Sequence, residues 1–261
     1  MNACSPAPRT AMILAAGLGT RLRPLTDRMP KALVPFEGVP MIQRLMVRLR
    51  EAGFTRAVIN VHHFADMLED FVRSHGGFGL EVEFSDERDL LRDTGGGIRH
   101  AVMSGLIGDE PVLVHNVDII TEGIDPGAFF NKVADNAKNP AAALLVSDRR
   151  ASRYLLADSD GMLRGWVHPA KGIFKSTGSA SRTPVQGPVP ADPHAMPGCT
   201  PLAFSGIHIL TPTALQLLRS WPEAFSIIDF FLTIAATHPV HCISAPPDAA
   251  ITDIGKLSLL Q

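Results

Sequence analysis

The chain has 261 residues, of which 46% are hydrophobic and 19% are charged, and its formal net charge is −2. This size and composition predict one soluble globular domain, and the balanced charge argues against a surface built for nucleic acid or an acidic membrane. Cys4, Cys199 and Cys242 are odd in number and lack CxxC spacing, so neither a disulfide framework nor a zinc site is expected. The first apolar run is too short for a membrane span or a secretory signal, which favours the cytoplasm.

Strand-like and helix-like segments alternate along the first half of the chain. The predicted strands, which are short apolar or alternating runs, are 11–16, 57–61, 80–85, 111–118 and 141–146. The predicted helices, which have apolar residues at helical spacing, are 40–53, 65–76, 97–104 and 129–138. This alternation predicts parallel strands joined by crossover helices. We therefore expect an α/β fold with a single Rossmann-like, doubly wound, mixed but mostly parallel sheet flanked by helices.

The second half changes character. Residues 153–168 predict a hairpin with Asp160 and Gly161 in its turn. Residues 175–198 contain five prolines and no apolar period, which predicts a flexible loop, either a lid or a tolerated insertion. The remaining predicted elements are strands at 201–210, 240–244 and 249–255 and helices near 212–220, 226–236 and 254–261. No internal repeat is evident, and no further domain is expected after residue 261.

The segment after the first strand, LAAGLGTRLRPLTDRMPKALVP (14–35), combines two glycines with several cations, which is typical of an anion-binding loop. A P-loop would need GxxxxGK[ST], but Lys31 lies twelve residues beyond Gly19. A dinucleotide fingerprint would need a third glycine where this chain has Leu22, and no acidic residue closes the second strand. Neither of these two phosphate-binding motifs therefore explains the loop.

The same segment resembles the signature loop of the sugar-1-phosphate nucleotidyltransferases, LAAGxGTRLxPLTxxxPKxLxP. The matching positions are Leu14, Ala15, Ala16, Gly17, Gly19, Thr20, Arg21, Leu22, Pro24, Leu25, Thr26, Pro30, Lys31, Leu33 and Pro35. Further similarity covers most of the chain, in the segments DTGGGI (93–98), HNVD (115–118), FSGIHIL (204–210) and TDIG (252–255). Within the family, the chain looks most like the short uridylyltransferases of N-acetylmuramic acid 1-phosphate and the small mannose-1-phosphate guanylyltransferases.

The resemblance implies a reaction in which an NTP, expected to be UTP or GTP, and a sugar 1-phosphate give an NDP-sugar and pyrophosphate. The sugar phosphate oxygen attacks the α-phosphorus in line, so catalysis rests on bringing two polyanions together and neutralising their charge. It also implies a single domain over 1–261, in which about 1–147 binds nucleotide. The remainder, about 148–261, would form a small β-rich lobe that binds the sugar phosphate. The oligomeric state stays open.

The resemblance assigns roles to the loop. Arg21 would clamp the phosphates that leave as pyrophosphate, and Lys31 would stabilise charge at the α-phosphate. Gly17 and Gly19 would let backbone N–H groups approach the triphosphate. The residues expected to bind nucleotide are Leu14, Ala15, Ala16, Gly17, Gly19, Thr20, Arg21, Thr94, Gly95 and Gly96. The glycines of DTGGGI would lie against the nucleobase and donate from their N–H groups, or else form only a helix-entry turn.

Two aspartates match the residues that hold Mg²⁺ in the family, namely Asp118 after the fourth strand and Asp253 near the end of the chain. Relatives usually carry glycine where this chain has Val117, which restricts the backbone beside Asp118. The residues expected to bind the sugar phosphate are Asn116, Lys171, Ser205 and Gly206. Many relatives carry this lysine in an EKP motif, whereas the sequence here is GWVHPAKG, so Lys171 is displaced and has no preceding glutamate.

Two other interpretations remain. His115 lies inside a predicted strand, where a hydrogen-bonded core histidine is more common than a catalytic base. The whole chain, in turn, fits either an active nucleotidyltransferase or a regulator that binds nucleotide or sugar phosphate without turnover. The presence of Arg21, Lys31, Asp118 and Asp253 favours the enzyme.

Overall fold

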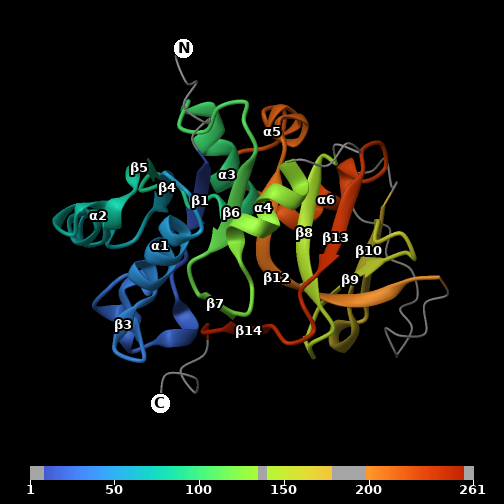
Figure 1. Ribbon diagram of the computed structural model, residues 1–261, viewed down its shortest axis with the longest axis horizontal. Helices are drawn as coiled ribbons and strands as arrows, with labels where there is room; N and C mark the ends of the chain where they lie inside the picture. Colours follow the sequence, from blue (N-terminus) through green and yellow to red (C-terminus); the bar gives the residue numbers. More distant parts are fainter. Residues whose placement is uncertain (1–8, 135–139, 178–197, 256–261) are drawn as a thin grey trace, which may run out of the picture.

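The computed structural model describes residues 9–134, 140–177 and 198–255. These residues form one large mixed sheet with helices on both faces (Figure 1). The predicted α/β class, with a mixed and mostly parallel sheet, is confirmed. Among the described residues, no helix has the length and apolarity needed to cross a lipid bilayer.

Four parallel strands in the order β5-β4-β1-β6 form the first part of the sheet. Their bounds are β1 Thr10–Leu14, β4 Arg56–Val61, β5 Glu81–Asp86 and β6 Val112–Asn116. β1 and β6 are apolar and almost wholly buried because helices cover both of their faces. All four strands were predicted, and they bring the segments that follow β1 and β6 to one edge of the sheet.

The sheet continues beyond β6 through a long antiparallel strand. β12 (Thr200–Leu210) pairs with β6 and with β8 (Ala142–Ser147), and β13 (Val240–Ser244) lies parallel to β8. The start of β12 turns away from β8 and pairs with the lobe strand β9 (Tyr154–Ala157). The predicted division into two halves near residue 147 therefore cuts through a continuous sheet, and it stays a prediction.

The lobe is a set of antiparallel strands in the order β11-β10-β9. β9 and β10 (Leu163–His168) form the predicted hairpin, and Gly161 in its turn has a φ of 75°. β11 (Ile173–Ser176) was not predicted, and it occupies the start of the expected loop 175–198. The rest of that loop, residues 178–197, lies outside the described residues.

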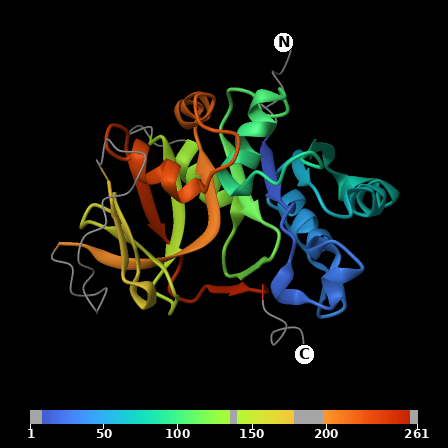
Figure 2. The same ribbon diagram turned by 180° about the vertical axis from the view of Figure 1, so that it is seen from behind.

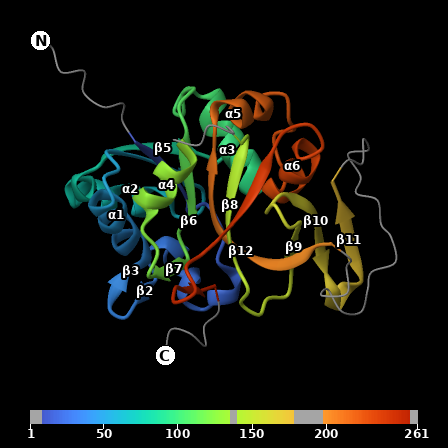
Figure 3. The same ribbon diagram turned by 45° about the vertical axis from the view of Figure 1, so that its right-hand side comes forward.

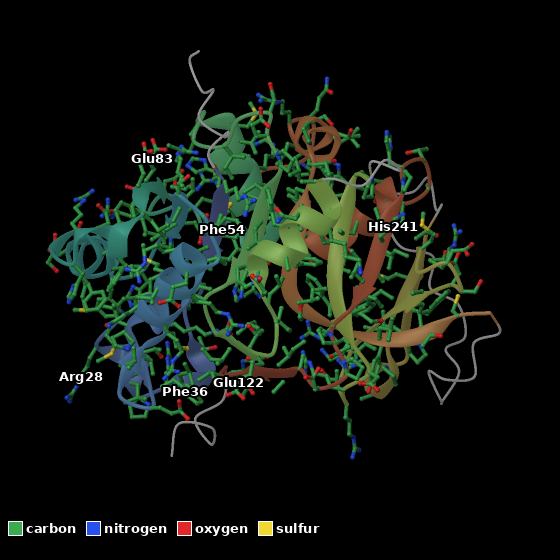
Figure 4. All side chains as sticks on the ribbon, viewed as in Figure 1. Arg28, Phe36, Phe54, Glu83, Glu122 and His241 are labelled. Atoms are coloured by element: carbon green, nitrogen blue, oxygen red, sulfur yellow. The ribbon has the colours of Figure 1, made fainter. Side chains whose placement is uncertain are left out.

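Helices cover both faces of the sheet (Figure 3). One face carries α1 (Met41–Glu51), α2 (Ala65–Ser74) and α4 (Pro126–Ala134). The other face, in front in Figure 2, carries α3 (Asp93–Met103), α5 (Pro212–Leu218) and α6 (Ile227–Ile234). Each layer buries its own apolar cluster. In the first, the ring of Phe54, labelled in Figure 4, packs edge-to-face against Phe130 with the ring centroids 5.5 Å apart. Helix positions were predicted well, apart from the early starts of α3 and α4, and residues 135–138 of the helix expected over 129–138 lie outside the described residues.

Two small ladders lie outside the large sheet. β2 (Pro35–Phe36) pairs with β3 (Val39–Pro40), and β7 (Ile119–Glu122) pairs antiparallel with β14 (Ala250–Asp253). The expectation that 249–255 returns to the main sheet is therefore wrong, because its partner is the unpredicted strand β7. The closing helix expected over 254–261 falls mostly on residues 256–261, which lie outside the described residues.

Candidate active site

The chain leaves β1 at Leu14 and folds into three single-turn 3-10 helices at Thr20–Leu22, Leu25–Asp27 and Lys31–Leu33. Gly17 is exposed, and a Cβ added there would meet nothing within 4 Å, so its backbone is open to a ligand. Gly19 differs, because its φ is +61° and an added Cβ would lie 2.7 Å from the methyl carbon of Thr26. Gly19 therefore shapes the loop, and only Gly17 offers the open backbone expected of both.

The two alanines before Gly17 have their N–H groups turned inward. Asn60 on β4 accepts from the N–H of Ala15 at 2.6 Å and from that of Ala16 at 3.2 Å. Neither N–H is therefore available to a phosphate in this conformation. A nucleotide contact from Ala15 or Ala16 would have to use other atoms, and it stays a prediction, as does one from the half-buried Leu14.

Lys31, which was expected to stabilise charge at the α-phosphate, contacts Asp118, which was expected to hold the metal. The ammonium group of Lys31 donates to Oδ2 of Asp118, and both side chains are largely buried. Val117, between β6 and β7, packs its side chain into the core and donates its N–H to the carbonyl of Leu14. Its backbone φ is not positive, so this position does not need the glycine found in relatives.

The second acid reaches the first through the β7–β14 ladder. Asp253 is the register partner of Ile119, and the N–H of Ile254 donates to the carbonyl of Asp118 at 2.9 Å. Oδ1 of Asp253 accepts from the N–H of Gly255 at 2.8 Å. Figure 1 shows the red strand β14 ending beside the blue N-terminal segment. The two aspartates, 135 positions apart in the sequence, therefore lie close together at the end of this ladder, where Asp118 directly precedes β7.

Arg21 completes this group. A Cβ added at Gly255 would lie 2.4 Å from Nη2 of Arg21 and 2.7 Å from Oδ1 of Asp253. The guanidinium group therefore lies over Gly255 beside the carboxylate of Asp253. Two other loop cations are not part of this group: Arg23 pairs with Asp27 in solvent, and Arg28 points outward (Figure 4).

Asp118 and Asp253 together could hold a divalent cation. Among the described residues, no three His, Cys, Asp or Glu side chains gather to form a metal site made of protein alone. Two carboxylates without a third ligand suit Mg²⁺, which usually binds through one or two carboxylates together with substrate phosphates and water. Asp118 and Asp253 fit that donor set.

The segment DTGGGI forms the first turns of α3, which begins at Asp93. The N–H groups of Gly95 and Gly96 donate to the carbonyl of Phe225, and a Cβ on Gly95 would lie 2.2 Å from the ring of Phe225. The expectation that these two N–H groups face a nucleobase is therefore wrong in this conformation, because the loop before α6 occupies them. The hydroxyl of Thr94 accepts from the N–H of Ile227. Contact of residues 94–96 with the nucleotide through other atoms stays a prediction.

Asn116 and Gly206 lie together at the site edge of the sheet. Gly206 has a φ of +81°, and a Cβ there would lie 2.7 Å from Nδ2 of Asn116, so only glycine admits the amide. Ser205 is 1% exposed; its hydroxyl donates to the carbonyl of Leu145 and accepts from the N–H of Ile207. This hydroxyl is used inside the sheet, which corrects the expectation that it contacts the sugar.

Lys171 lies in a 3-10 turn after β10 and is exposed. A different lysine is held in place on the lobe. Nζ of Lys175 on β11 is 2.5 Å from Oδ1 of Asp229 on α6 and 5.4 Å from the ring centre of Trp166. The role of Lys171 stays a prediction, and Lys175 is the lysine that joins the lobe to α6.

Comparison with known proteins now decides the family. The family model described as "Nucleotidyl transferase" matches residues 10–164. The chain is also 35% identical over 245 residues to N-acetylmuramate alpha-1-phosphate uridylyltransferase of Caulobacter vibrioides, covering 93% of this chain and 90% of that protein. The chain belongs to the nucleotidyl transferase family.

Other relatives agree with this assignment. A uridylyltransferase of the same name from Neisseria meningitidis is 40% identical over 134 residues, which is 51% of this chain and 57% of that protein. Among solved structures, HddC from Yersinia pseudotuberculosis, complexed with GMP-PN, superposes with a TM-score of 0.70 at 23% identity, covering 97% of this chain and 96% of that one. At this identity the likeness establishes the fold only.

Two buried histidines lie next to the site in this nucleotidyl transferase. Nδ1 of His115 is 2.8 Å from the carbonyl of Asn116, which confirms it as a hydrogen-bonded core histidine. Burial lowers the pKa of His115 to about 4. Burial also lowers the pKa of His208, to about 3, and the nearby His115 adds to this shift. Both rings are therefore neutral near pH 7. Neither ring nitrogen of His208 has a hydrogen-bond partner among the described residues.

Sequence reasoning missed Asn60 and Glu87. Both side chains are buried, and Nδ2 of Asn60 donates to Oε1 of Glu87 at 2.8 Å. The pKa of Glu87 is raised, because burial has a larger effect than the hydrogen bonds from Asn60 and from the backbone of Arg92, which lower it. The only sequence signal was an asparagine at the end of an apolar strand, which no motif of the family singled out.

Proposed function

We propose that this nucleotidyl transferase joins a nucleoside monophosphate unit from an NTP to a sugar 1-phosphate and releases pyrophosphate. The observation that carries this proposal is the meeting of Arg21, Lys31, Asp118 and Asp253, which come from three separate parts of the chain. Two polyanionic substrates repel each other strongly at close range, so a site that joins them needs cations and metal-binding acids together.

The residues would divide the work by position. Gly17 would give the triphosphate an open backbone, and Arg21, which lies over Gly255, would neutralise the β- and γ-phosphates as they leave. The ammonium group of Lys31, which contacts Asp118, would stabilise charge on the α-phosphate. A magnesium ion bound by Asp118 and Asp253 would supply further positive charge for the phosphate oxygens.

For the substrates we propose UTP and N-acetylmuramic acid 1-phosphate. The support is the 35% identity to a uridylyltransferase of that name along nearly the whole length of both proteins. Mannose-1-phosphate guanylyltransferases match smaller shares of this chain, for example 54% for the protein from Mycobacterium tuberculosis. GTP with mannose 1-phosphate is therefore the second pair to test.

The test is a panel of four NTPs against several sugar 1-phosphates with Mg²⁺, followed by pyrophosphate release. We expect UTP with N-acetylmuramic acid 1-phosphate to give the highest kcat/KM. Faster turnover of GTP with mannose 1-phosphate would replace the proposed substrates but keep the reaction. Nucleotide binding without turnover of any pair would favour the regulator over the enzyme.

A further inference from the structure

Asn60 lies at the carboxyl end of β4, in register between Leu14 of β1 and Ser85 of β5. Its side chain leaves the strand toward the loop after β1, where Oδ1 accepts from the N–H groups of Ala15 and Ala16. One side-chain oxygen therefore fixes the Leu14–Ala15 and Ala15–Ala16 peptide units, which lead into Gly17. Among the described residues, no group accepts from the N–H of Gly17 or Leu18.

Glu87 holds Asn60 from the other side. Oε1 of Glu87 accepts from Nδ2 of Asn60 at 2.8 Å, and Oε2 accepts from the N–H of Arg92 at 3.3 Å. The backbone of Glu87 is anchored as well, because its N–H donates to the carbonyl of Val61 at 2.8 Å. Glu87 is fully buried, so water does not compete for these contacts.

The side chains of Asn60 and Glu87 pack tightly against Gly97, where no larger residue would fit without displacing them. A Cβ on Gly97 would lie 2.6 Å from Oε1 of Glu87 and 2.9 Å from Nδ2 of Asn60. The hydrogen bonds also have a fixed direction. The oxygen of Asn60 faces two donors and its NH₂ faces an acceptor, so a flipped amide would place donors against donors on the loop.

We infer that Asn60 and Glu87 are positioning residues that hold the backbone before Gly17, so that the N–H groups of Gly17 and Leu18 point at the bound phosphates. Glu87 acts through Asn60, and Asn60 acts through the peptide units of Ala15 and Ala16. The identity of the bound group as a triphosphate rests on the proposed function, whereas the hydrogen-bond chain does not.

The pair allows a swap of its amide and carboxyl groups. In Asn60→Asp with Glu87→Gln, the new carboxylate accepts from the loop and from the new amide, and the amide oxygen accepts from the N–H of Arg92. Every hydrogen bond is restored with the same net charge and nearly the same volume. Each single substitution breaks the chain: Glu87→Gln must place its NH₂ against Asn60 or against the N–H of Arg92, and Asn60→Asp sets two carboxyl groups face to face.

Two measurements at pH 8 test the inference. Exchange of the Ala15 and Ala16 amide protons, read by NMR without nucleotide, should be faster in both single variants and return to the wild-type rate in the double variant. The Kd for the Mg²⁺ complex of the NTP should rise by about tenfold or more in the single variants and recover to within about threefold in the double variant. The KM for the sugar 1-phosphate at saturating NTP should change by less than about threefold throughout.

A double variant that is no better than Glu87→Gln in amide exchange would overturn the inference, and so would single variants that keep wild-type exchange. If Asn60→Asp does not fold, the comparison of Glu87→Gln with the double variant decides alone. Because amide exchange needs no nucleotide, failure of the inference is distinguishable from failure of the proposed function, which the substrate panel tests separately.

Discussion

Lys31 donates to the carboxylate of Asp118 although 87 positions separate the two residues in the sequence. The lysine lies in the third 3-10 turn of the loop after β1, and the aspartate follows β6, the parallel neighbour of β1. The pair therefore ties the anion-binding loop to the acid proposed to hold the metal. Its side chains are 13% and 11% exposed, so the ion pair is screened less by solvent than one on the open surface.

Replacement of this lysine should slow the chemical step. We expect Lys31→Met, which keeps the length of the side chain, to lower kcat by about 10²–10³-fold through lost charge stabilisation. Arg23→Met is the matched control, because the side chain of Arg23 is 65% exposed and its ion pair with Asp27 is the only one it makes among the described residues. Initial rates of pyrophosphate release decide the matter, and a loss below about tenfold for Lys31→Met would remove it from catalysis.

Replacement of the acid should act through the metal. Asp118→Asn keeps the shape of the side chain and loses the charge, so we expect Mg²⁺-dependent turnover to be abolished while the circular dichroism spectrum stays native. Asp253→Asn should give the same result, because Asp253 pairs with Ile119, the residue that follows Asp118, and the N–H of Ile254 donates to the carbonyl of Asp118. Titration of Mg²⁺ against turnover tests both. Near-normal rates in Asp118→Asn at saturating Mg²⁺ would contradict the metal assignment.

The two loop glycines should respond differently to alanine. Gly17→Ala enters open space, so its free energy of unfolding should stay within about 0.5 kcal/mol of the wild type while nucleotide affinity falls. Gly19→Ala must adopt a left-handed backbone and meet Thr26, which should cost about 1–3 kcal/mol of stability. Chemical denaturation and calorimetric titration with NTP measure the two effects. Unchanged affinity in Gly17→Ala would move the phosphates away from that residue.

Lys171 and Lys175 on the lobe should have different roles, the first in binding the sugar 1-phosphate and the second in stabilising the fold. We expect Lys171→Met to raise the KM for the sugar 1-phosphate and leave that for the NTP unchanged, as its predicted role requires. Lys175→Met removes the contact with Asp229 and should lower the free energy of unfolding by about 1 kcal/mol or less, since the pair is only partly buried. Steady-state kinetics with each substrate varied provide the test. If only Lys175→Met raises the KM for the sugar 1-phosphate, the binding role passes to Lys175.

His208 should make the protein acid-sensitive. Its folded pKa of about 3 lies below the ordinary value of 6.5, so the folded protein binds fewer protons than the unfolded chain and stability falls as the pH drops from 6.5 toward 3. Between pH 7 and 5 this costs about 2 kcal/mol, which His208→Leu and His208→Gln should both remove. Denaturation at each pH measures it. An unchanged acid loss in both variants would exclude His208 as the cause.

Much of the fold could be predicted because the central strands are apolar runs separated by helices with clear periodicity. β7 and β11 were missed because each has only four residues, too few for a period to emerge, whereas β14 was predicted as a strand but assigned to the wrong sheet. Their pairing is decided by contacts between distant segments. The meeting of Arg21 with Asp253 depends on the β7–β14 ladder, so only the resemblance to a family, and no local pattern, connected the two.

The site was predicted best where one segment carries many fixed positions and worst where a single polar residue acts. Ser205 matched the family by position, but β12 brings its hydroxyl against the carbonyl of Leu145. Asn60 and Glu87 are 27 positions apart, and their spacing matches no motif. Their contact follows from the parallel pairing that places β4 between β1 and β5. Side-chain partners across a sheet are not encoded in local order.

The late position of β14 in the chain has a consequence for synthesis. The loop after β1, β6 and Asp118 all leave the ribosome long before Asp253, which lies in the last strand that the structure describes. A nascent chain can therefore build the sheet around β1 while it still holds only one of the two carboxylates. We therefore expect the growing polypeptide to have no activity until β14 has been synthesised and has folded, even if it already binds nucleotide.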